Sequence, residues 1–466
     1  MVRDALVMRD AFGFPCIPGT SIAGVVRHAL EDHAKEEERE ALREFFGYQE
    51  SNTGVGAKIR FSPALLVIKN DVPSLHNFMQ YAKEFKWWFT QLPVRNHVRI
   101  NHRGVVDGDG LFDNEIVYKG GRFVAEFELT GSEDDLPLWN KVLEVIRSSI
   151  FRVGQGTRKG YGRLQVIGLS EKKFDLREQQ DFQDYLEYDS NFCPAWRDVG
   201  SLLLLAESHE SQPEERNEPE SEGVIHYELR LYPESFFFFG SGHGDEDADD
   251  TPLLERVITY DENNYIHLAD ARNVIPGSSI KGALRHRTCF YYNKRKKRYA
   301  EVYANSQLVK IVTGNMNNAV YALFGAESGA SFTAHDGILE NGGPEARSGR
   351  RGVVLIDDVF LENVVNDKVL NHIQIDRFTG GVIDGALFSE KVSRFKDDSY
   401  VRVSVKVLPF EVKDQEDIIG AFEDALRDVC RGVLPLGGMA TKGQGIFTGS
   451  LWKNGEKMYE YLNPIK

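Results

Sequence analysis

Two turns rich in Pro, Gly and hydroxyl side chains have the composition of a phosphate-binding site. The segments 17–21 (IPGTS) and 275–279 (IPGSS) each precede a stretch with helical periodicity. A helix N-terminus presents unpaired N–H groups and the positive end of the helix dipole, and both favour an anion. Lys281 and Arg285 lie four residues apart, on one helical face, so both are predicted to reach a phosphate. A capped helix that carries surface basic residues is the alternative interpretation.

Two glycine-rich loops, 153–162 (VGQGTRKGYG) and 436–445 (LGGMATKGQG), have the small side chains that let a backbone approach a ligand closely. The second loop lacks the spacing of a nucleotide-binding P-loop. The first is not a dinucleotide-binding fingerprint, because it follows a helix and precedes a strand. Since Lys159 and Lys442 lie in these loops, the predicted ligand is an anion.

The net charge of −15 argues at first sight against a nucleic-acid partner. The acidic excess, however, is concentrated in the segments 207–222 and 243–250, while basic residues gather over 281–298 and end in the run 294–298 (KRKKR). A local basic patch can bind phosphate despite an acidic total. The alternative is that this run is the solvated end of a helix.

The composition is that of a soluble protein with room for two or three domains, with 466 residues, 41% hydrophobic and 27% charged. The apolar runs are too short to span a membrane and the N-terminus has no apolar signal region, so we expect a cytoplasmic protein with no membrane partner. The four cysteines are far apart, which indicates neither a disulfide framework nor a thiolate zinc site.

Four motifs occur twice, in the same order, in the two halves of the chain. The pairs are 17–24 with 275–282, 45–47 with 323–325, 96–100 with 371–375, and 153–162 with 436–445. Four matches in register indicate a duplicated module. An acidic stretch with two prolines separates the copies, which predicts a first module at 1–205, a linker at 206–223 and a second module at 224–466.

Each half is predicted to be a mixed unit of helices and strands. Apolar periodicity predicts helices at 21–34, 138–150 and 416–431, with a Ser or Thr as the N-cap of the first. Strand-like runs occupy 57–68, 122–129, 163–169, 352–362, 400–408 and 445–451. The order strand–helix–strand–strand–helix–strand is the ferredoxin-like (RRM-like) pattern, so the predicted fold class is α+β, with two tandem modules of this fold.

These paired motifs resemble those of the repeat-associated (RAMP) superfamily of CRISPR proteins. The segment 372–388 is similar to the thumb hairpin of the backbone subunits of type III effector complexes, whereas the resemblance is weak over 170–222, 251–272 and 326–351. Two backbone modules in one chain suggest a type III-D-like fusion. The resemblance implies that the partners are guide RNA (crRNA), target RNA and other type III effector subunits, including a large polymerase-like subunit.

The resemblance implies that each module binds the guide RNA backbone through its Pro-Gly-Ser helix and its glycine-rich loop, while the thumb wedges into the guide–target duplex. The implied RNA-binding residues are Gly19, Thr20, Ser21, Arg27, Gly154, Lys159, Gly160 and Tyr161 in the first module, and Gly277, Ser278, Ser279, Lys281, Arg285, Gly437, Gly438, Lys442 and Gly443 in the second. The implied thumb residues are His97, Arg99, His372 and Arg377, and the histidine rings can stack on bases.

The resemblance also implies a metal-dependent cut in the target RNA, beside an acidic residue in the loop before the Pro-Gly-Ser turn. Asp4 fits this position in the first module and Asp250 fits it in the second, while Asp249 and Asp247 are close enough to compete. The implied chemistry is attack by the 2′-hydroxyl of the RNA at a geometry that the thumb enforces, with a divalent metal, Mg²⁺, as cofactor. No His-x-x-x-His or His–Glu helix suggests a metal site, so the metal ligands stay unassigned.

Two other interpretations are open, a non-catalytic scaffold that binds guide RNA and a guide-processing endoribonuclease. Three departures from the family pattern bear on the choice. Position 23 is Ala where the family has Lys, and Gln374 stands where the first copy has Arg99. The first module also lacks its opening strand, for which Leu202–Ala206 is a candidate substitute.

Overall fold

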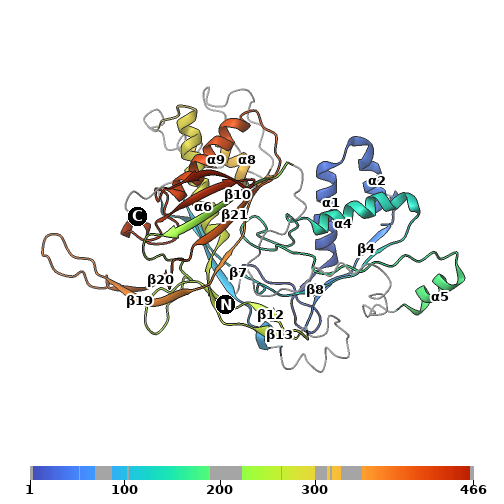
Figure 1. Cartoon of the computed structure of the whole chain (residues 1–466), viewed down its shortest axis with the longest axis horizontal. Helices are drawn as coiled ribbons and strands as arrows, with labels where there is room; N and C mark the ends of the chain where they lie inside the picture. Colours follow the sequence, from blue (N-terminus) through green and yellow to red (C-terminus); the bar gives the residue numbers. More distant parts are fainter. Residues whose placement is uncertain are drawn as a thin grey trace.

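The computed structural model describes residues 4–51, 53–68, 85, 87–101, 104–188, 223–263, 265–299, 312–314, 317–326 and 349–461. The predicted acidic linker, apart from its last residue Gly223, and Leu202–Ala206 lie outside the described residues. Figure 1 shows two α+β units side by side, which we call the first module (residues up to 188) and the second module (residues from 223). No described helix is long and apolar enough to cross a membrane.

Short strands dominate the first module. Its elements are β1 (Cys16–Ile17), α1 (Gly19–His33), α2 (Glu36–Phe46), β2 (Tyr48–Glu50), β3 (Thr53–Val55), β4 (Ile59–Phe61), β5 (Ala64–Leu66), β6 (Val94–Ile100), β7 (Val106–Glu115), β8 (Phe123–Val124), β9 (Phe127–Leu129), α4 (Leu136–Arg147) and α5 (Gln179–Glu187).

Longer strands and helices form the second module. Its elements are β10 (Ile225–Pro233), β11 (Leu254–Glu255), β12 (Ile258–Tyr260), β13 (Ile266–Leu268), β14 (Arg272–Ile275), α6 (Gly277–Arg295), α8 (Asn318–Phe324), β15 (Gly325–Ala326), β16 (Arg350–Arg351), β17 (Val354–Ile356), β18 (Val359–Leu361), β19 (Val364–His372), β20 (Phe388–Phe395), β21 (Val401–Val407), α9 (Gln415–Cys430), β22 (Phe447–Lys453) and β23 (Glu456–Glu460).

The sheet of the second module has the predicted ferredoxin-like order. The strands run β17–β21–β10–β22–β23, with β10 antiparallel to both of its neighbours. Val401, Val403, Val405 and Val407 of β21 alternate with other residues and are each no more than 1% exposed. Their buried face packs in one core with α6 and α9 (Figure 1). The strand predicted at 400–408 and the helix predicted at 416–431 are therefore confirmed.

The first module contains the same parts around a smaller core. Buried apolar side chains of α1, α2, β4 and α4 form that core. The short strands pair as β1–β5–β8 and as β4–β9. The prediction of a strand at 163–169 is wrong, because the strand that would pair with it has no counterpart among the described residues of this module.

Glycine begins both Pro-Gly helices for a packing reason. The predicted Ser or Thr caps are wrong, since the preceding proline is the N-cap of both α1 and α6, and no side-chain cap bond forms. A Cβ atom on Gly19 would lie 2.1 Å from the Phe61 carbonyl oxygen, and one on Gly277 would lie 2.6 Å from that of Ile356. Glycine therefore lets the first turn of each helix pack against the end of a neighbouring strand.

The segment 251–272 ties the second module to the first. Ile258 and Ile266 of its β12–β13 hairpin are buried in one cluster with first-module side chains, Phe14 among them. Backbone bonding reinforces this contact, because the Ile266 N–H donates to the Ile68 carbonyl at 3.2 Å. An insertion in one module thus completes an apolar core in the other.

A buried arginine on β6 also crosses the junction. Arg95, which is 3% exposed, donates to both carboxylate oxygens of Glu255 and to Asp358 Oδ2 at 2.6 Å. Asp358 in turn accepts the Gly277 N–H at the start of α6, at 2.8 Å. Burial lowers the pKa of Arg95, but the two carboxylates outweigh it and hold that pKa above its ordinary value. The charged guanidinium therefore links β6 to β11 and to the turn between β17 and β18, and Asp358 extends the link to the start of α6.

The substitution Arg95→Met should lower the free energy of unfolding by about 3–5 kcal/mol, because it leaves two buried carboxylates without their counter-charge. Urea unfolding, followed by the transition midpoint, measures the loss. The matched control is Arg394→Met, which removes an arginine from an exposed pair with Asp367 and should cost less than about 1 kcal/mol. Equal effects of the two substitutions would show that the junction does not depend on Arg95.

Candidate nucleic-acid interface

The base of the second thumb, the hairpin of β19 and β20, carries a stack of His, Phe and Lys side chains. His372 and Phe388 are direct cross-strand partners, and their rings stack with centroids 4.7 Å apart. Lys442, from the glycine-rich loop, places Nζ 4.3 Å from the centroid of the Phe388 ring. The lysine is exposed, so it offers a positive charge to solvent beside an aromatic surface.

The first thumb, the hairpin of β6 and β7, repeats this stack. His97 and Phe112 are again cross-strand partners, with ring centroids 4.9 Å apart. The loop lysine, Lys159, is exposed and has its Nζ 5.5 Å from the Phe112 centroid. We call the three side chains in each module the thumb stack. Its recurrence shows that the duplicated motifs assemble one arrangement twice.

A side-chain contact joins each glycine-rich loop to its thumb, through the variable residue of Lys-Gly-x-Gly. In the first module Tyr161 Oη lies 2.8 Å from His97 Nε2 in a hydrogen bond. In the second module Gln444 Nε2 donates to Glu390 Oε1, which lies 3.0 Å from His372 Nε2. The loop is therefore held against the thumb histidine directly in the first module, and through the Glu390 carboxylate in the second.

Two exposed aspartates occupy equivalent places beside the thumbs. The Asp4 N–H donates to Asp113 Oδ1 and the Asp113 N–H donates to Asp4 Oδ2, both at 3.0 Å. In the second module the Asp249 N–H donates to Ser389 Oγ at 3.1 Å, and the Ser389 N–H donates to Asp249 Oδ2 at 2.8 Å. Asp113 and Ser389 each follow the stacked Phe directly. The structural counterpart of Asp4 is therefore Asp249, where the sequence favoured Asp250.

Asp250 follows Asp249 directly in the chain, but its side chain is more buried than that of Asp249. Its backbone bridges Glu390 as Ala5 bridges Asn114 in the first module. Its Oδ1 is buried and has no hydrogen-bond partner among the described residues. Burial raises the pKa of Asp250, and the nearby Glu390 carboxylate adds to the shift. Asp247, the remaining acidic candidate, is exposed and pairs with Lys391 at 3.0 Å.

The side chain of Lys281 is not at the surface, where the predicted contact with a phosphate would require it. Its side chain is 8% exposed, and Nζ donates to the carbonyl oxygens of Arg158 at 3.0 Å and Val354 at 2.8 Å. Burial lowers the pKa of Lys281 to about 7, and the nearby basic residues add to the shift. In this structure Lys281 joins the glycine-rich loop of the first module to the second module, so its amine does not face a surface phosphate.

The glycines of the two loops divide into packed and open positions. A Cβ atom on Gly160 (φ 108°) would lie 2.0 Å from Asp358 Oδ1, and one on Gly437 (φ 94°) would lie 2.3 Å from the Phe238 carbonyl oxygen. Gly154 (φ 94°) and Gly443 (φ 86°), by contrast, have no described atom within 4 Å of a Cβ position. The packed glycines fix the loop, and the open ones leave its backbone accessible to a ligand.

The other predicted RNA-binding and thumb residues lie mostly at the surface. Arg27 pairs with Glu31 at 2.7 Å within α1, and Arg285 is partly buried, which lowers its pKa. The exposed predicted residues are Thr20, Arg99, Ser279 and Arg377, and those at intermediate exposure are Ser21, Ser278 and Gly438. Phosphate binding by these residues stays a prediction.

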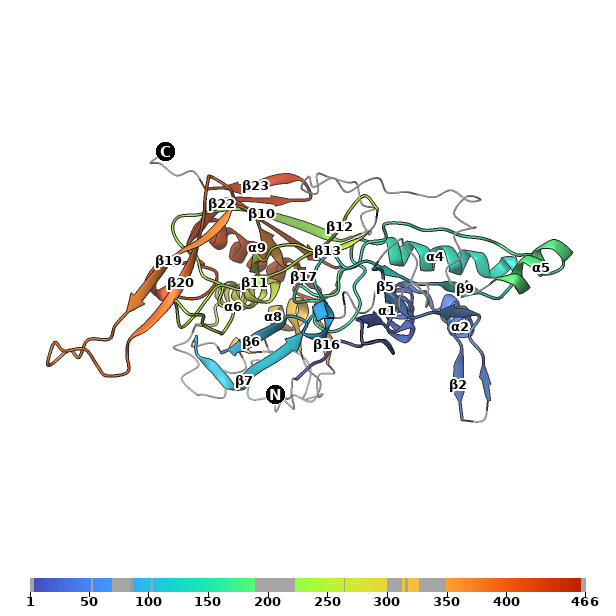
Figure 2. The same cartoon turned by 90° about the horizontal axis from the view of Figure 1, so that it is seen from below.

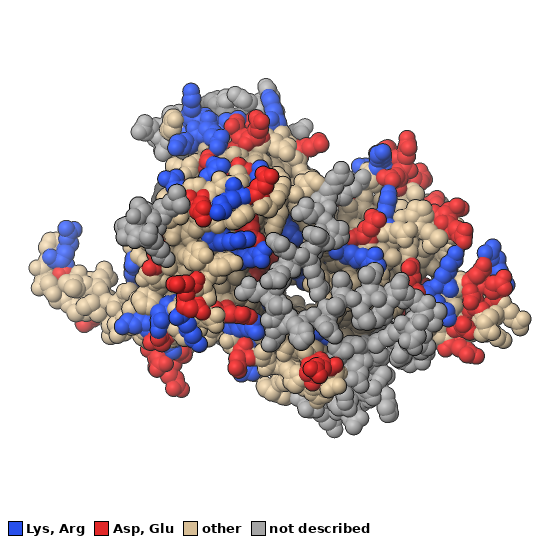
Figure 3. All heavy atoms as spheres, viewed as in Figure 1, with Lys and Arg blue, Asp and Glu red and all other residues tan. Residues whose placement is uncertain are grey.

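Two residues of the basic run at 294–298, Arg295 and Lys296, pair with acidic side chains of α9 and of its N-cap. Arg295 contacts Asp424 at 2.6 Å, and Lys296 contacts Asp414 at 3.2 Å and Asp417 at 2.9 Å. Figure 3 shows basic and acidic side chains interspersed on this face of the second module. The run therefore fits its alternative interpretation, the charged end of a helix.

The two thumbs differ in what they contact. The first lies against the second module, where Asn96 Nδ2 donates to the Ser241 carbonyl at 3.0 Å and His286 Nε2 lies 3.2 Å from the Ile100 carbonyl. The second thumb projects away from the body of the molecule (Figure 2). Phe378, near its tip, is 91% exposed. One thumb is thus docked within the chain and the other is presented to solvent.

The acidic candidates are compatible with a metal that takes few protein ligands. Within the described ranges, no group of three His, Cys, Asp or Glu side chains is placed to hold a metal ion. Asp4 and Asp249 each present a single exposed carboxylate. Mg²⁺ commonly binds through one or two carboxylates together with phosphates and water. Such a carboxylate therefore fits Mg²⁺ when RNA phosphates supply further ligands.

Several residues of the site were not singled out from the sequence. Phe112 and Phe388 complete the thumb stacks. The sequence repeat could have identified them, because each follows a Leu at the same point of the repeat. The repeat pairs Glu390 with Glu115, whereas in the structure Asn114 holds the position equivalent to Glu390. Gln444 has Tyr161 in its place in the first module. The pairing of Glu390 with Gln444 depends on loop geometry that motif comparison does not contain.

The fold and the repeated thumb stacks define a tandem ferredoxin-like protein with two matched candidate RNA-binding faces. The family model of the RAMP superfamily matches residues 2–165 and 230–448, and the chain belongs to this superfamily. Membership makes it a CRISPR-associated RNA-binding subunit. Comparison with curated proteins gives no match to the chain.

The His97 ring should stay neutral down to acidic pH. Burial lowers the pKa of His97 to about 4, and the charges of Lys159 and Arg95 add to the shift. Because His in an unfolded chain titrates near about 6.5, the unfolded state gains this proton first, and stability contributed by neutral His97 is lost as pH falls from about 6.5 to 4. Histidine NMR titration measures the midpoint directly.

Lys159→Met should raise that midpoint part of the way toward the ordinary value, because burial is the larger cause and stays in place. A wild-type midpoint near about 6.5 would contradict the account, since it would show that water reaches the base of the first thumb.

Proposed function

We propose that this chain is a double backbone subunit of a type III CRISPR effector complex, of a type III-D-like kind. It holds the guide RNA along its two modules and cleaves complementary target RNA at one position beside each thumb. Guide RNA, target RNA and further effector subunits, including a large polymerase-like subunit, are its partners in this proposal.

The repeated arrangement around the thumbs carries the proposal. Each module places an exposed aspartate in hydrogen bonds with the thumb residue that follows the stacked Phe. Each also places an exposed loop lysine over that Phe. A base-stacking ring, a cation for phosphate and a carboxylate for a metal are the three parts that position an RNA strand for cleavage.

The aspartates have a defined role in this scheme. Asp4 and Asp249 are the residues that would hold Mg²⁺, which supplies charge stabilisation at the scissile phosphate when bound. The thumb turns the target strand so that a 2′-hydroxyl lines up with the adjacent phosphorus, and the loop lysine neutralises a neighbouring phosphate. The protein contributes position and charge, and the nucleophile comes from the RNA.

The test is cleavage of an end-labelled target RNA by the guide-loaded complex with Mg²⁺. Asp4→Asn should abolish one cut and Asp249→Asn should abolish a second cut at a fixed spacing, each with a rate loss of at least about 100-fold and with target binding intact. Removal of Mg²⁺ by a chelator should abolish both cuts.

Two neighbouring aspartates provide matched controls in the same loop. Asp247→Asn removes an exposed carboxylate that pairs with Lys391, and it should leave both cuts unchanged. Asp250→Asn distinguishes the two second-module candidates, because loss of the second cut in this variant alone would return the catalytic role to Asp250. Survival of every cut in all four variants would leave the chain as a non-catalytic guide-binding scaffold.

A further inference from the structure

Helices α6 and α9 pack on one side of the second-module sheet. The side chains that enter the core with them come from odd-numbered positions of β10, β21 and β22, among them Leu229, Val403 and Leu451. Figure 2 shows both helices on the same side of β10 and β22. Side chains at even-numbered positions therefore lie on the opposite side, which we call the outer face, because successive residues of a strand point in opposite directions.

Two tyrosines lie side by side on the outer face, on adjacent strands. Tyr232 of β10 and Tyr400, directly before β21, have ring centroids 5.5 Å apart. The two side chains are 46% and 39% exposed, so a ligand can reach both rings. Aromatic side chains on the sheet of an RRM-like fold stack on the bases of single-stranded RNA. The tyrosine pair offers a stacking surface of this kind.

Two arginines occupy the next row of the outer face. Arg230 and Arg402 are direct cross-strand partners on β10 and β21, and their Nε groups donate to Glu228 at 2.6 Å and 2.7 Å. Burial raises the pKa of Glu228, but the two guanidinium groups outweigh it and hold that pKa below its ordinary value. One carboxylate shared by two arginines leaves a net positive charge beside the tyrosines, which complements an RNA phosphate.

A tryptophan on β22 extends this surface. The guanidinium carbon of Arg230 lies 4.7 Å from the centroid of the Trp452 ring, and Nζ of Lys457 on β23 lies 5.2 Å from it. Aromatic rings interleaved with cations suit a ligand that has both flat bases and phosphates. We call five of these residues the sheet patch: Tyr232, Tyr400, Arg230, Arg402 and Trp452.

The matching strand of the first module carries acidic side chains instead. β9 corresponds to β21, because β9 pairs with β4 in the way that β21 pairs with β17. Glu126, directly before β9, and Glu128 within it stand where β21 has Ser404 and Lys406. The sheet patch is therefore a feature of the second module and not of the repeated fold.

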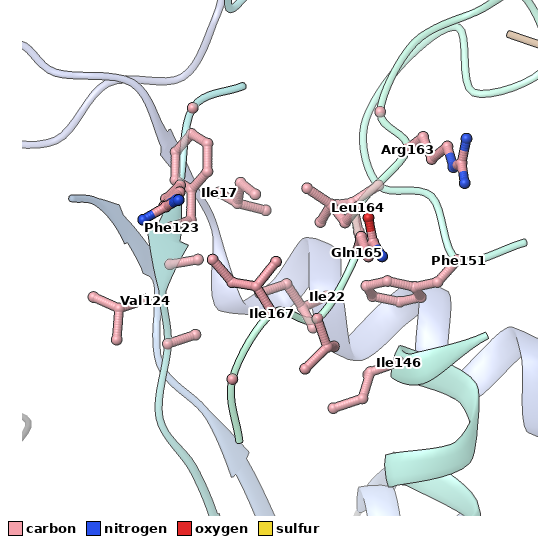
Figure 4. A pocket seen from close by; sticks show the side chains of 18 of the residues that line it. Ile17, Ile22, Phe123, Val124, Ile146, Phe151, Arg163, Leu164, Gln165 and Ile167 are labelled. Atoms are coloured by element: carbon pink, nitrogen blue, oxygen red, sulfur yellow. The ribbon is translucent and has the colours of Figure 1, made fainter. Parts of the chain in front are cut away.

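The size of the neighbouring cavity favours a polymer over a small ligand. Described residues of both modules border a cavity of about 4720 Å³, and most of the sheet patch lines it. Figure 4 shows apolar side chains of the first module on this cavity, with Phe123, Ile146 and Leu164 among them. Small-molecule sites have volumes of about 300–1,000 Å³. The cavity exceeds that range several times, as a site for a nucleic-acid strand requires.

We propose that the sheet patch is a further RNA-binding site of this chain, which stacks unpaired bases of single-stranded RNA and shares no residue with the thumb stacks. The bases stack on Tyr232 and Tyr400, while Arg230 and Arg402 contact phosphates of the same strand. The site accepts any sequence, because every base has a flat face. Unpaired parts of a guide RNA and of a target RNA share this chemistry, so the experiment has one arm for each source.

Photo-crosslinking of the purified full-length chain tests the site. The probe is an oligouridylate that carries photoreactive thiouridine, and adducts are assigned to residues by mass spectrometry. Tyr232→Leu combined with Tyr400→Leu should lower the adduct yield at Trp452 at least about 10-fold, because leucine fills the space without offering a flat ring. The matched control, Tyr232→Phe with Tyr400→Phe, keeps both rings and should stay within about twofold of the wild type.

Two results of this experiment would overturn the proposal. One is a wild-type chain whose adducts lie at the thumb stacks and are absent from the sheet patch. The other is equal yield at Trp452 in the leucine and phenylalanine pairs. Thermal unfolding of each variant, with a midpoint near that of the wild type, shows that the second module is folded.

The guide-loaded complex identifies the source of the RNA. Thiouridine is placed in the guide in one arm and in unpaired target RNA in the other, and adducts at the sheet patch in either arm name the strand that binds. A sheet patch that the complex protects from hydroxyl radicals, without adducts in either arm, would make it a protein interface and overturn the proposal. Asp4→Asn with Asp249→Asn, which tests cleavage, should leave these adducts unchanged, so a failure of the cleavage proposal is distinguishable from a failure of this one.

Discussion

The rest of the structure depends on one buried ion pair, between Arg95 at the base of the first thumb and Glu255 with Asp358 in the second module. A charge buried to this extent is stable only with its counter-charges in place, so the pair specifies a single arrangement of the two modules. Asp358 extends the effect, because it also accepts the first N–H of α6. The same contact therefore fixes the base of the first thumb, the junction between the modules and the first turn of α6.

That constraint explains why the two copies differ although their motifs match. The first thumb lies against the second module, whereas the second thumb projects into solvent. Lys281 is buried against the glycine-rich loop of the first module, whereas the equivalent position of the first copy is Ala23, which has no such side chain. A rigid junction holds the two thumb stacks at one separation, as the proposed binding of one guide RNA across both modules requires.

Motif comparison predicted the duplication, the main helices and the histidines of both thumbs, because repeated local patterns encode repeated local structure. It could not separate Asp249 from Asp250, since the choice depends on strand pairing with Ser389 and Glu390. It also missed the burial of Lys281, which depends on the docking of one module on the other. The strand expected at 163–169 failed because a strand forms only with a partner, and no local pattern reports that partner.

The most direct test of the account is the distance distribution between the two modules. Spin labels at Glu40→Cys on α2 and Glu416→Cys on α9 occupy exposed positions, with Cys16 and Cys193 replaced by Ser to avoid labelling elsewhere. Double electron–electron resonance should give one narrow distribution that guide RNA leaves unchanged, and Arg95→Met should broaden it. A broad or two-peaked distribution in the otherwise unaltered chain would contradict a junction locked by Arg95.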